Sequence, residues 1–189
     1  MPTHTLLREF SAENFTDVPA AIAAGARRIE LCDNMAVGGS SPSAGVIEGT
    51  VAYAHAHGAR VMAMVRPRGG NFEYSDAELA MMETDARIAL AFGVDGIVFG
   101  CLTRAEDGAL DLDRVALERL MAIAHEVGEE RGEAVDVTFH MAFDELDEQR
   151  QLAAIDTLAE LGVSRILTHG GAAGTPIEDH LDRLRALIE

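Results

Sequence analysis

Two arginines flank a proline in the segment 65–72 (VRPRGGNF), directly after an apolar run. A guanidinium group can bind a carboxylate or a phosphate through two parallel hydrogen bonds. The two glycines that follow would allow a ligand to approach the backbone closely. Arg66 and Arg68 therefore form a candidate anion-binding site. The alternative is structural ion pairing with one of three acids, Glu9, Glu30 or Asp144.

A histidine and an aspartate lie four residues apart in the segment 137–144 (VTFHMAFD). The ordinary pKa of histidine is close to neutral pH, so His140 is a candidate general acid or base. The carboxylate of Asp144 could orient its ring. The alternatives are a buried histidine bonded to a backbone carbonyl, and an aspartate that only caps a helix.

Glu30 lies between two apolar residues of a predicted strand, so alternation turns it to the opposite side, toward the interior or mouth of a barrel. A buried acid needs a partner, and Arg66 on the neighbouring strand is the nearest candidate. The loop 37–43 (VGGSSPS) precedes a predicted helix. Ser41 and Ser43 could therefore form an oxyanion cradle, although such loops are more often simple turns.

Cys32 and Cys101 each follow a predicted strand. Soft thiolates select copper(I), so a metal site at these residues is one interpretation. The other is that both are small buried hydrophobic residues. Their wide separation argues against a disulfide framework and is typical of a reducing compartment.

Short apolar runs alternate with longer amphipathic segments along the whole chain. The predicted strands are 5–10, 28–32, 60–65, 96–100, 135–140 and 165–168. The predicted helices are 18–24, 43–57, 76–92, 112–130, 148–161 and 177–189. Strict alternation indicates a parallel sheet with helices on its faces. Because polar residues follow nearly every strand, the pattern favours a TIM-type (β/α) barrel over a doubly wound sheet.

Length and charge restrict the possible functions. The chain reads as one domain, 1–189, with about six βα units, whereas a closed TIM-type barrel has eight. We expect either a short chain closed by another subunit or a chain that continues past residue 189. The net charge is −17, which argues against nucleic acid and against an anionic membrane. With no secretory signal or membrane span in the sequence, we expect a cytoplasmic protein.

Six strings of residues together resemble the CutC copper-homeostasis family. In chain order they are RIELC (28–32), GGSSPSAG (38–45), VRPRGGNFEYSD (65–76), GIVFG (96–100), VTFHMAFD (137–144) and RILT (165–168). The resemblance implies a TIM-type barrel, a cytoplasmic setting, a homodimer or larger homo-oligomer, and a role in copper handling. Of the two cysteines on which the family's copper proposal depends, Cys32 matches the second. The first would fall near Phe10, and it is absent here.

The chain departs from the family pattern at three further positions. Met141 stands where the family usually has an arginine, and Cys101 where it more often has a small residue. His169 replaces a small hydroxyl residue. These departures weaken the expectation of a two-thiolate copper site and of shared anion chemistry at the mouth.

Two hypotheses of function follow, from different classes. In the first, the chain is a CutC-like copper-homeostasis protein that binds copper(I) in the cytoplasm, with Cys32 as a metal ligand. In the second, it is a barrel enzyme acting on a small carboxylate or phosphate substrate. There Arg66 and Arg68 clamp the anion, and His140 moves a proton with help from Asp144 or Glu30. A non-catalytic relative, altered at Met141, is a third interpretation.

Overall fold

The computed structural model of the chain describes residues 6–171 and 174–188. Its main sheet has six strands in the order β1-β2-β3-β4-β7-β8, and β5 and β6 form a separate antiparallel pair. The strands are β1 Glu9–Glu13, β2 Arg28–Cys32, β3 Arg60–Met64, β4 Gly96–Phe99, β5 Leu102–Arg104, β6 Leu110–Leu112, β7 Asp136–Phe139 and β8 Arg165–Ile166. The α-helices are α1 Val18–Ala23, α2 Ala44–Ala56, α3 Asp76–Ala91, α4 Arg114–Arg131, α5 Glu148–Glu160 and α6 Leu181–Ile188. Short 3-10 helices are η1 Met35–Val37, η2 Met141–Glu145 and η3 Ile177–His180.

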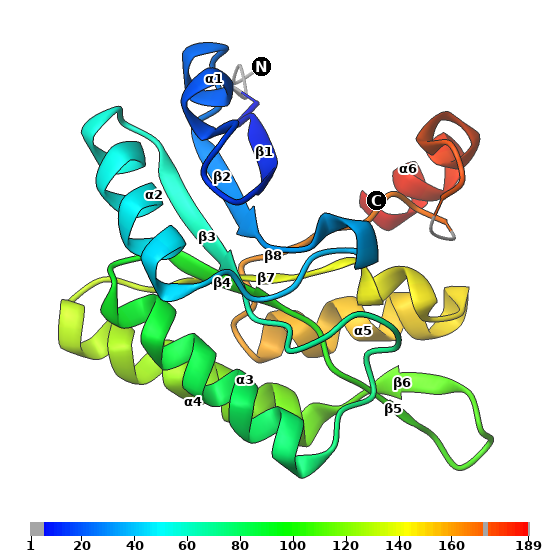
Figure 1. The fold of residues 1–189 in the computed structure, drawn as a ribbon. Helices are drawn as coiled ribbons and strands as arrows, with labels where there is room; N and C mark the ends of the chain where they lie inside the picture. The colour runs from blue at the N-terminus through cyan, green and yellow to red at the C-terminus, as the bar shows by residue number, and fades with distance from the viewer. Residues whose placement is uncertain (1–5, 172–173, 189) are drawn as a thin grey trace.

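The sheet forms an open arc with helices along its outer side (Figure 1). Every neighbouring pair of its strands is parallel. The two edge strands, β1 and β8, do not pair with each other within the described residues. The prediction of an α/β fold of TIM-barrel type with six βα units is confirmed, in the form of a half-barrel.

Alternation along the strands separates two buried layers. Ile29 and Leu31 of β2 belong to the large hydrophobic core, together with residues of the surrounding helices. Cys32 faces the other way and packs with Met62, Met64 and Val98 in a second, smaller cluster. The second cluster therefore lies on the inner face of the arc, where a closed barrel would have its centre.

Several element boundaries differ from the sequence prediction. The first strand begins at Glu9, because pairing of Glu9 with Arg28 sets its register, while Leu6 and Leu7 are exposed; residue 5 of the predicted strand lies outside the described residues. Glu9 thus lies at the start of β1, not near its end as predicted. The β5–β6 hairpin was not predicted. Its apolar residues are too few to show alternation, and the helix after it begins at Arg114 rather than at 112.

The last of the six predicted βα units also differs from the prediction. Strand β8 covers two residues instead of four. The single helix predicted over 177–189 is divided into η3 and α6. By contrast, the start of α3 is sharply defined by a capping box, in which the Ser75 hydroxyl accepts from the Glu78 amide and the Glu78 carboxylate accepts from the Ser75 amide.

Candidate functional site

Three neighbouring strands place Arg66, Gly100 and His140 side by side at their carboxyl ends. The Val65 amide donates to the Val98 carbonyl at 2.8 Å, and the His140 amide donates to the Phe99 carbonyl at 3.0 Å. This register gives the three residues the same inward orientation as Val98. A Cβ atom on Gly100 would lie 2.5 Å from Nδ1 of His140. The glycine therefore provides the space that the imidazole occupies.

Arg66 is 97% buried, with 3% of its surface exposed, and it joins two loops. Its guanidinium donates to the carbonyl oxygens of Val37 at 2.9 Å, Gly39 at 3.0 Å and Gly70 at 2.7 Å. The ring of Phe72 covers it, with the Arg66 Cζ atom 4.8 Å from the ring centroid. The predicted ion pair with Glu30 is wrong, because the backbone carbonyls of the loops occupy the terminal nitrogens instead.

Arg68 turns away from Arg66 and secures its own loop. Its guanidinium is paired with Glu78 of the α3 capping box. It also donates to the backbone carbonyls of Asn71 and Glu73, each at 2.9 Å. The two arginines share none of these partners, so the predicted clamp of Arg66 with Arg68 is wrong. The structural alternative of pairing with Glu9, Glu30 or Asp144 is wrong as well, since both arginines find closer partners.

The serine loop also has a structural role. The Ser41 hydroxyl accepts from the Arg66 amide at 3.0 Å and donates to the Arg66 carbonyl at 3.2 Å. Ser43 is the exposed N-cap residue of α2, and its side chain makes no capping hydrogen bond. The two serines therefore do not converge on one point as an oxyanion cradle would require.

His140 is nearly fully buried, with 4% of its surface exposed. Its ring packs against Phe72 with a centroid separation of 4.8 Å, and its Nδ1 accepts from the Ala142 amide at 3.2 Å. Burial and, to a smaller extent, the positive charge of Arg66 together lower the pKa of His140 to about 3. The imidazole is therefore neutral near pH 7, which makes it a poor general base.

Asp144 does not assist His140 and instead holds the segment after β8. Its carboxylate accepts from the Thr168 hydroxyl, from the His169 amide at 3.2 Å and from Nδ1 of His169 at 3.1 Å. The Asp144 side chain is 3% exposed. The predicted His140–Asp144 pair is wrong, because η2 carries the aspartate past His140 to the next strand.

Glu30 and Cys32 form a pair on the inner face of β2. The Cys32 thiol donates to Glu30 Oε1 at 3.6 Å, and the Ser11 hydroxyl donates to Glu30 Oε2 at 3.4 Å. Burial raises the pKa of Glu30, and the charge of Glu9 adds to the rise. Burial also raises the pKa of the Cys32 thiol, with a further contribution from Glu30. Glu30 is thus inward-facing, as the alternation predicts.

The remaining candidates lie apart from this pair. Cys101 belongs to the large core, whereas Cys32 belongs to the inner cluster, so the two thiols do not share a site. Glu9 is bound to Arg28 at 2.7 Å. Among the residues that the structure describes, no three His, Cys, Asp or Glu side chains are grouped closely enough to hold a metal ion.

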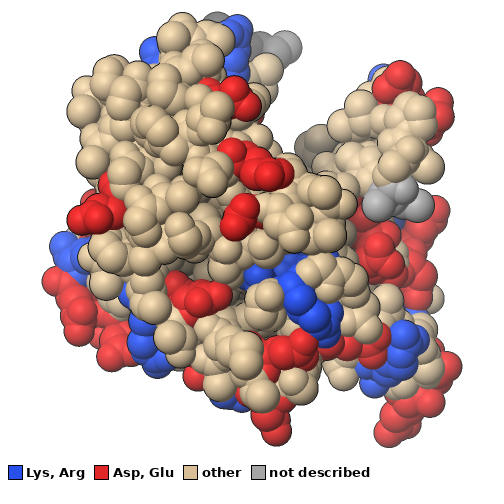
Figure 2. Space-filling view, viewed as in Figure 1, with Lys and Arg blue, Asp and Glu red and all other residues tan. Residues whose placement is uncertain are grey.

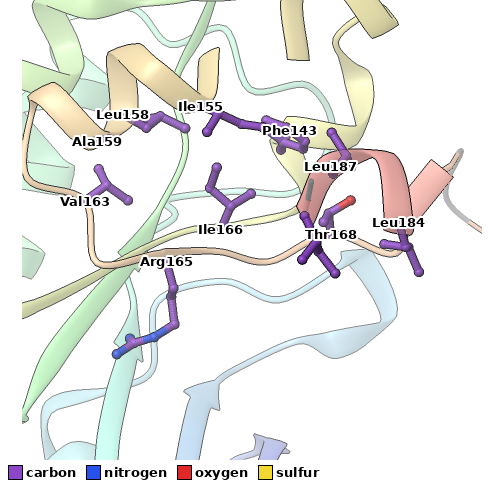
Figure 3. A pocket seen from close by; sticks show the side chains of 11 residues that line it. Phe143, Ile155, Leu158, Ala159, Val163, Arg165, Ile166, Thr168, Leu184 and Leu187 are labelled. Atoms are coloured by element: carbon purple, nitrogen blue, oxygen red, sulfur yellow. The ribbon is translucent and has the colours of Figure 1, made fainter. Parts of the chain in front are cut away.

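A pocket of about 410 Å³ lies away from the mouth, between α5, β8 and α6. Figure 3 shows Ile166 pointing into it, toward α5, while Arg165 points to the opposite side of β8. Apolar side chains dominate the lining: Phe143, Ile155, Leu158, Ala159, Val163, Ile166, Leu184, Leu187 and Ile188. Neither Arg66 nor His140 nor Cys32 lines this pocket.

The charges on the surface are unevenly distributed. In the view of Figure 2, a group of basic side chains lies near the middle of the face, close to the loop between β3 and α3, with acidic side chains above it as well as along the lower rim. None of the helices in 6–171 and 174–188 is long and apolar enough to cross a membrane.

Sequence reasoning missed two groups of residues at this site. Met62 and Met64 were read as ordinary members of a buried strand, although alternation alone places them on the same face as Cys32. Tyr74 was read only as part of a motif, yet it lies beside the arginines, with Arg68 Cζ 5.2 Å from its ring centroid. Its loop position gave no periodic signal.

The amino-acid sequence of this chain is similar to those of CutC proteins. The model of the CutC family matches residues 6–189. A CutC family protein of Enterococcus faecalis is 56% identical over 183 residues, covering 97% of this chain and 82% of that protein. The human copper homeostasis protein cutC homolog is 40% identical over 164 residues, covering 87% of this chain and 54% of its own length.

Solved structures agree with the sequence comparisons. A CutC crystal structure from Streptococcus agalactiae superposes with a TM-score of 0.86 at 42% identity, covering 97% of this chain and 82% of that one. An archaeal fructose 1,6-bisphosphate aldolase, at 18% identity, gives a TM-score of 0.60 and covers 91% of this chain and 60% of its own. At such low identity the aldolase shows a shared fold only.

Proposed function

The chain belongs to the CutC family, and from this premise we propose that it serves copper homeostasis by binding copper(I) on the inner face of its sheet. The human and mouse relatives are named copper homeostasis protein homologs. One observation carries the proposal to particular residues: Cys32 packs with Met62 and Met64 in one buried cluster. A thiolate and two thioethers are the soft ligands that copper(I) prefers.

These residues fit copper(I) chemically, and Glu30 supplies the proton acceptor that the Cys32 thiol needs. A thiol must lose its proton to bind a metal, and burial, which raises the pKa of Cys32, opposes that loss. The Cys32 thiol already donates to Glu30 Oε1 at 3.6 Å. Because burial raises the pKa of Glu30 as well, this carboxylate is suited to accept the thiol proton. Copper(I) would be held as cargo and would undergo no reaction here.

The site is also close to solvent on one side. Ser11 and Glu13, which pair in register with Glu30 and Cys32, are exposed on the edge strand β1. An ion would therefore have to pass only the edge strand to reach Cys32, Met62 and Met64. The absence of a cysteine near Phe10 leaves one thiol, and in this proposal the two methionines take the place of the second.

A competition titration tests the proposal. Reduced protein is titrated with copper(I) against a chromogenic copper(I) chelator, and the wild type is compared with Cys32→Ser and with Cys101→Ser. Losing a ligand should weaken binding by about tenfold to a hundredfold, whereas Cys101→Ser, which removes the thiol outside the cluster, should bind as the wild type does. Wild-type affinity in Cys32→Ser would refute the site, and an intermediate loss in Met64→Leu would support it.

We further propose that the protein works in the cytoplasm as a homo-oligomer. Both cysteines are free and buried, which is consistent with a reducing compartment. Among the described residues, β1 and β8 are the edge strands of the main sheet, and a second subunit is one way to cover such edges. Light scattering coupled to gel filtration tests the oligomer, and a monomeric mass at micromolar concentration would refute it.

A further inference from the structure

Three buried polar atoms at the mouth lack a hydrogen-bond partner among the described residues. They are Nε of Arg66, the hydroxyl oxygen of Tyr74 and Nε2 of His140. Only two other buried side-chain nitrogen or oxygen atoms in the described part of the chain share this property, and they belong to Arg28 and Thr50. A buried polar group without a partner destabilises the folded protein. Three such groups in one place therefore call for a common explanation.

All three groups can donate a hydrogen, and the Tyr74 hydroxyl can also accept one. The Nε–H of arginine is always a donor. Nδ1 of His140 accepts from the Ala142 amide, so it carries no proton, and the neutral ring must carry its hydrogen on Nε2. Burial raises the pKa of Tyr74 to about 12, so its hydroxyl keeps its proton. The site therefore has three donors, one of which belongs to a cation.

Arg66 and His140 contact the same aromatic ring, and Arg66 also interacts with Tyr74. Phe72 lies 4.8 Å from Arg66 Cζ and 4.8 Å, ring to ring, from His140. The charge of Arg66 acts on the pKa of both His140 and Tyr74. The glycine between Arg66 and His140 makes room for the imidazole, since any larger residue at position 100 would collide with it.

We propose that Arg66, Tyr74 and His140 bind an anionic oxygen of a small carboxylate or phosphate at the carboxyl ends of β3, β4 and β7. Three donors around a cationic group favour an oxygen with negative charge and disfavour a metal ion or an ammonium group. This site differs from the clamp predicted from the sequence. Arg68, Ser41 and Ser43 take no part, and His140 serves as a donor rather than as a base. The proposal does not depend on copper binding.

Phe72 marks the route by which the anion would enter. The ring that covers Arg66 and His140 also lines a pocket of about 280 Å³, between the loop after β3 and the β5–β6 hairpin. The lining residues are Gly70, Asn71, Phe72, Glu73, Leu102, Leu110 and Glu145. Movement of the Phe72 side chain would connect this pocket to the three donors. The lining includes two carboxylates, Glu73 and Glu145, which disfavour a highly charged anion, although Glu73 is paired with Arg104 at 3.1 Å.

Calorimetric titration of the full chain tests the proposal, with inorganic phosphate and oxalate as separate probes and sodium chloride at matched ionic strength as the control. Tyr74→Phe removes one donor and keeps the ring. Because no hydrogen bond of ordinary geometry holds the hydroxyl and its one side-chain hydrogen-bonding interaction is with Arg66, this variant should be close to the wild type in stability. Its affinity for the probe that binds should fall about tenfold. Tyr53→Phe, at the chain's other tyrosine, should change neither property.

The outcomes separate the alternatives. Binding of oxalate alone identifies a carboxylate site, and binding of phosphate alone identifies a phosphate site. Loss of binding in Tyr74→Phe with unchanged stability supports the proposal in either case. If neither probe binds beyond the chloride control, the three donors are satisfied by water and the proposal is wrong. Undiminished binding in Tyr74→Phe would refute it too.

Discussion

Replacing Arg66 with lysine should lower the free energy of unfolding much more than replacing Arg68 with lysine. Lysine keeps the positive charge but has one nitrogen in place of the planar fork. It cannot reach all three carbonyls that Arg66 holds at 2.7–3.0 Å. A hydrogen bond from a charged group contributes about 1.5–3 kcal/mol. The loss of two such bonds would therefore lower the free energy of unfolding by about 3–6 kcal/mol.

Urea unfolding followed by far-ultraviolet circular dichroism measures this difference, with linear extrapolation to water. Arg68→Lys is the matched control, because it makes the same change two residues away. Arg68 and its partner Glu78 are both partly exposed, and exposed ion pairs contribute little to stability. A loss below about 1 kcal/mol in Arg66→Lys, or equal losses in the two variants, would refute the idea that Arg66 ties the two loops together.

Two further predictions concern the same row of residues. Gly100→Ala should lower the free energy of unfolding by about 1–3 kcal/mol, because its Cβ would collide with His140. Gly49→Ala in α2, where nothing lies within 4 Å, should raise it by up to about 1 kcal/mol in the same urea assay. The low pKa of His140, about 3, means that the unfolded chain takes up a proton near pH 6.5 while the folded chain does not. Stability should therefore fall as the pH drops below about 6.5, by up to about 1.4 kcal/mol per unit. His140→Gln should remove this part of the slope, and an unchanged slope between pH 6.5 and 4 would contradict it.

The fold could be predicted to a large extent because its signals are local. Buried parallel strands are apolar on both faces, as in 61–65 and 97–99, and glycines end the helices between them. The errors fall where local patterns are weak. The run around Leu6 and Leu7 is apolar but exposed, and only pairing with β2 reveals where β1 begins. The hairpin of β5 and β6 depends on contacts that no short window contains.

The sequence predicted where the site residues lie, but it did not predict which groups they bind. Arg66 and His140 lie at the mouth as expected, and Glu30 faces inward. Their predicted partners, however, rested only on which strands are neighbours in the sheet. The order of the strands does not determine where the end of a long side chain lies. Arg66 reaches backbone carbonyls, which carry no signature in a sequence. Asp144 passes over His140 because a 3-10 helix intervenes, and such short helices leave little periodic trace.

The order of the strands has a consequence for how the chain folds. Each strand of the main sheet pairs with the sheet strand that precedes it in the sequence, so paired residues are separated by only 19 residues between β1 and β2 and 40 between β4 and β7. Such separations keep contact order low for a parallel sheet. During synthesis at about 5–20 residues per second, each new βα unit can dock on the one already formed. We expect the nascent half-barrel to grow from β1 onward, with substitutions in β1 and β2 reducing the yield of folded protein before later units have left the ribosome.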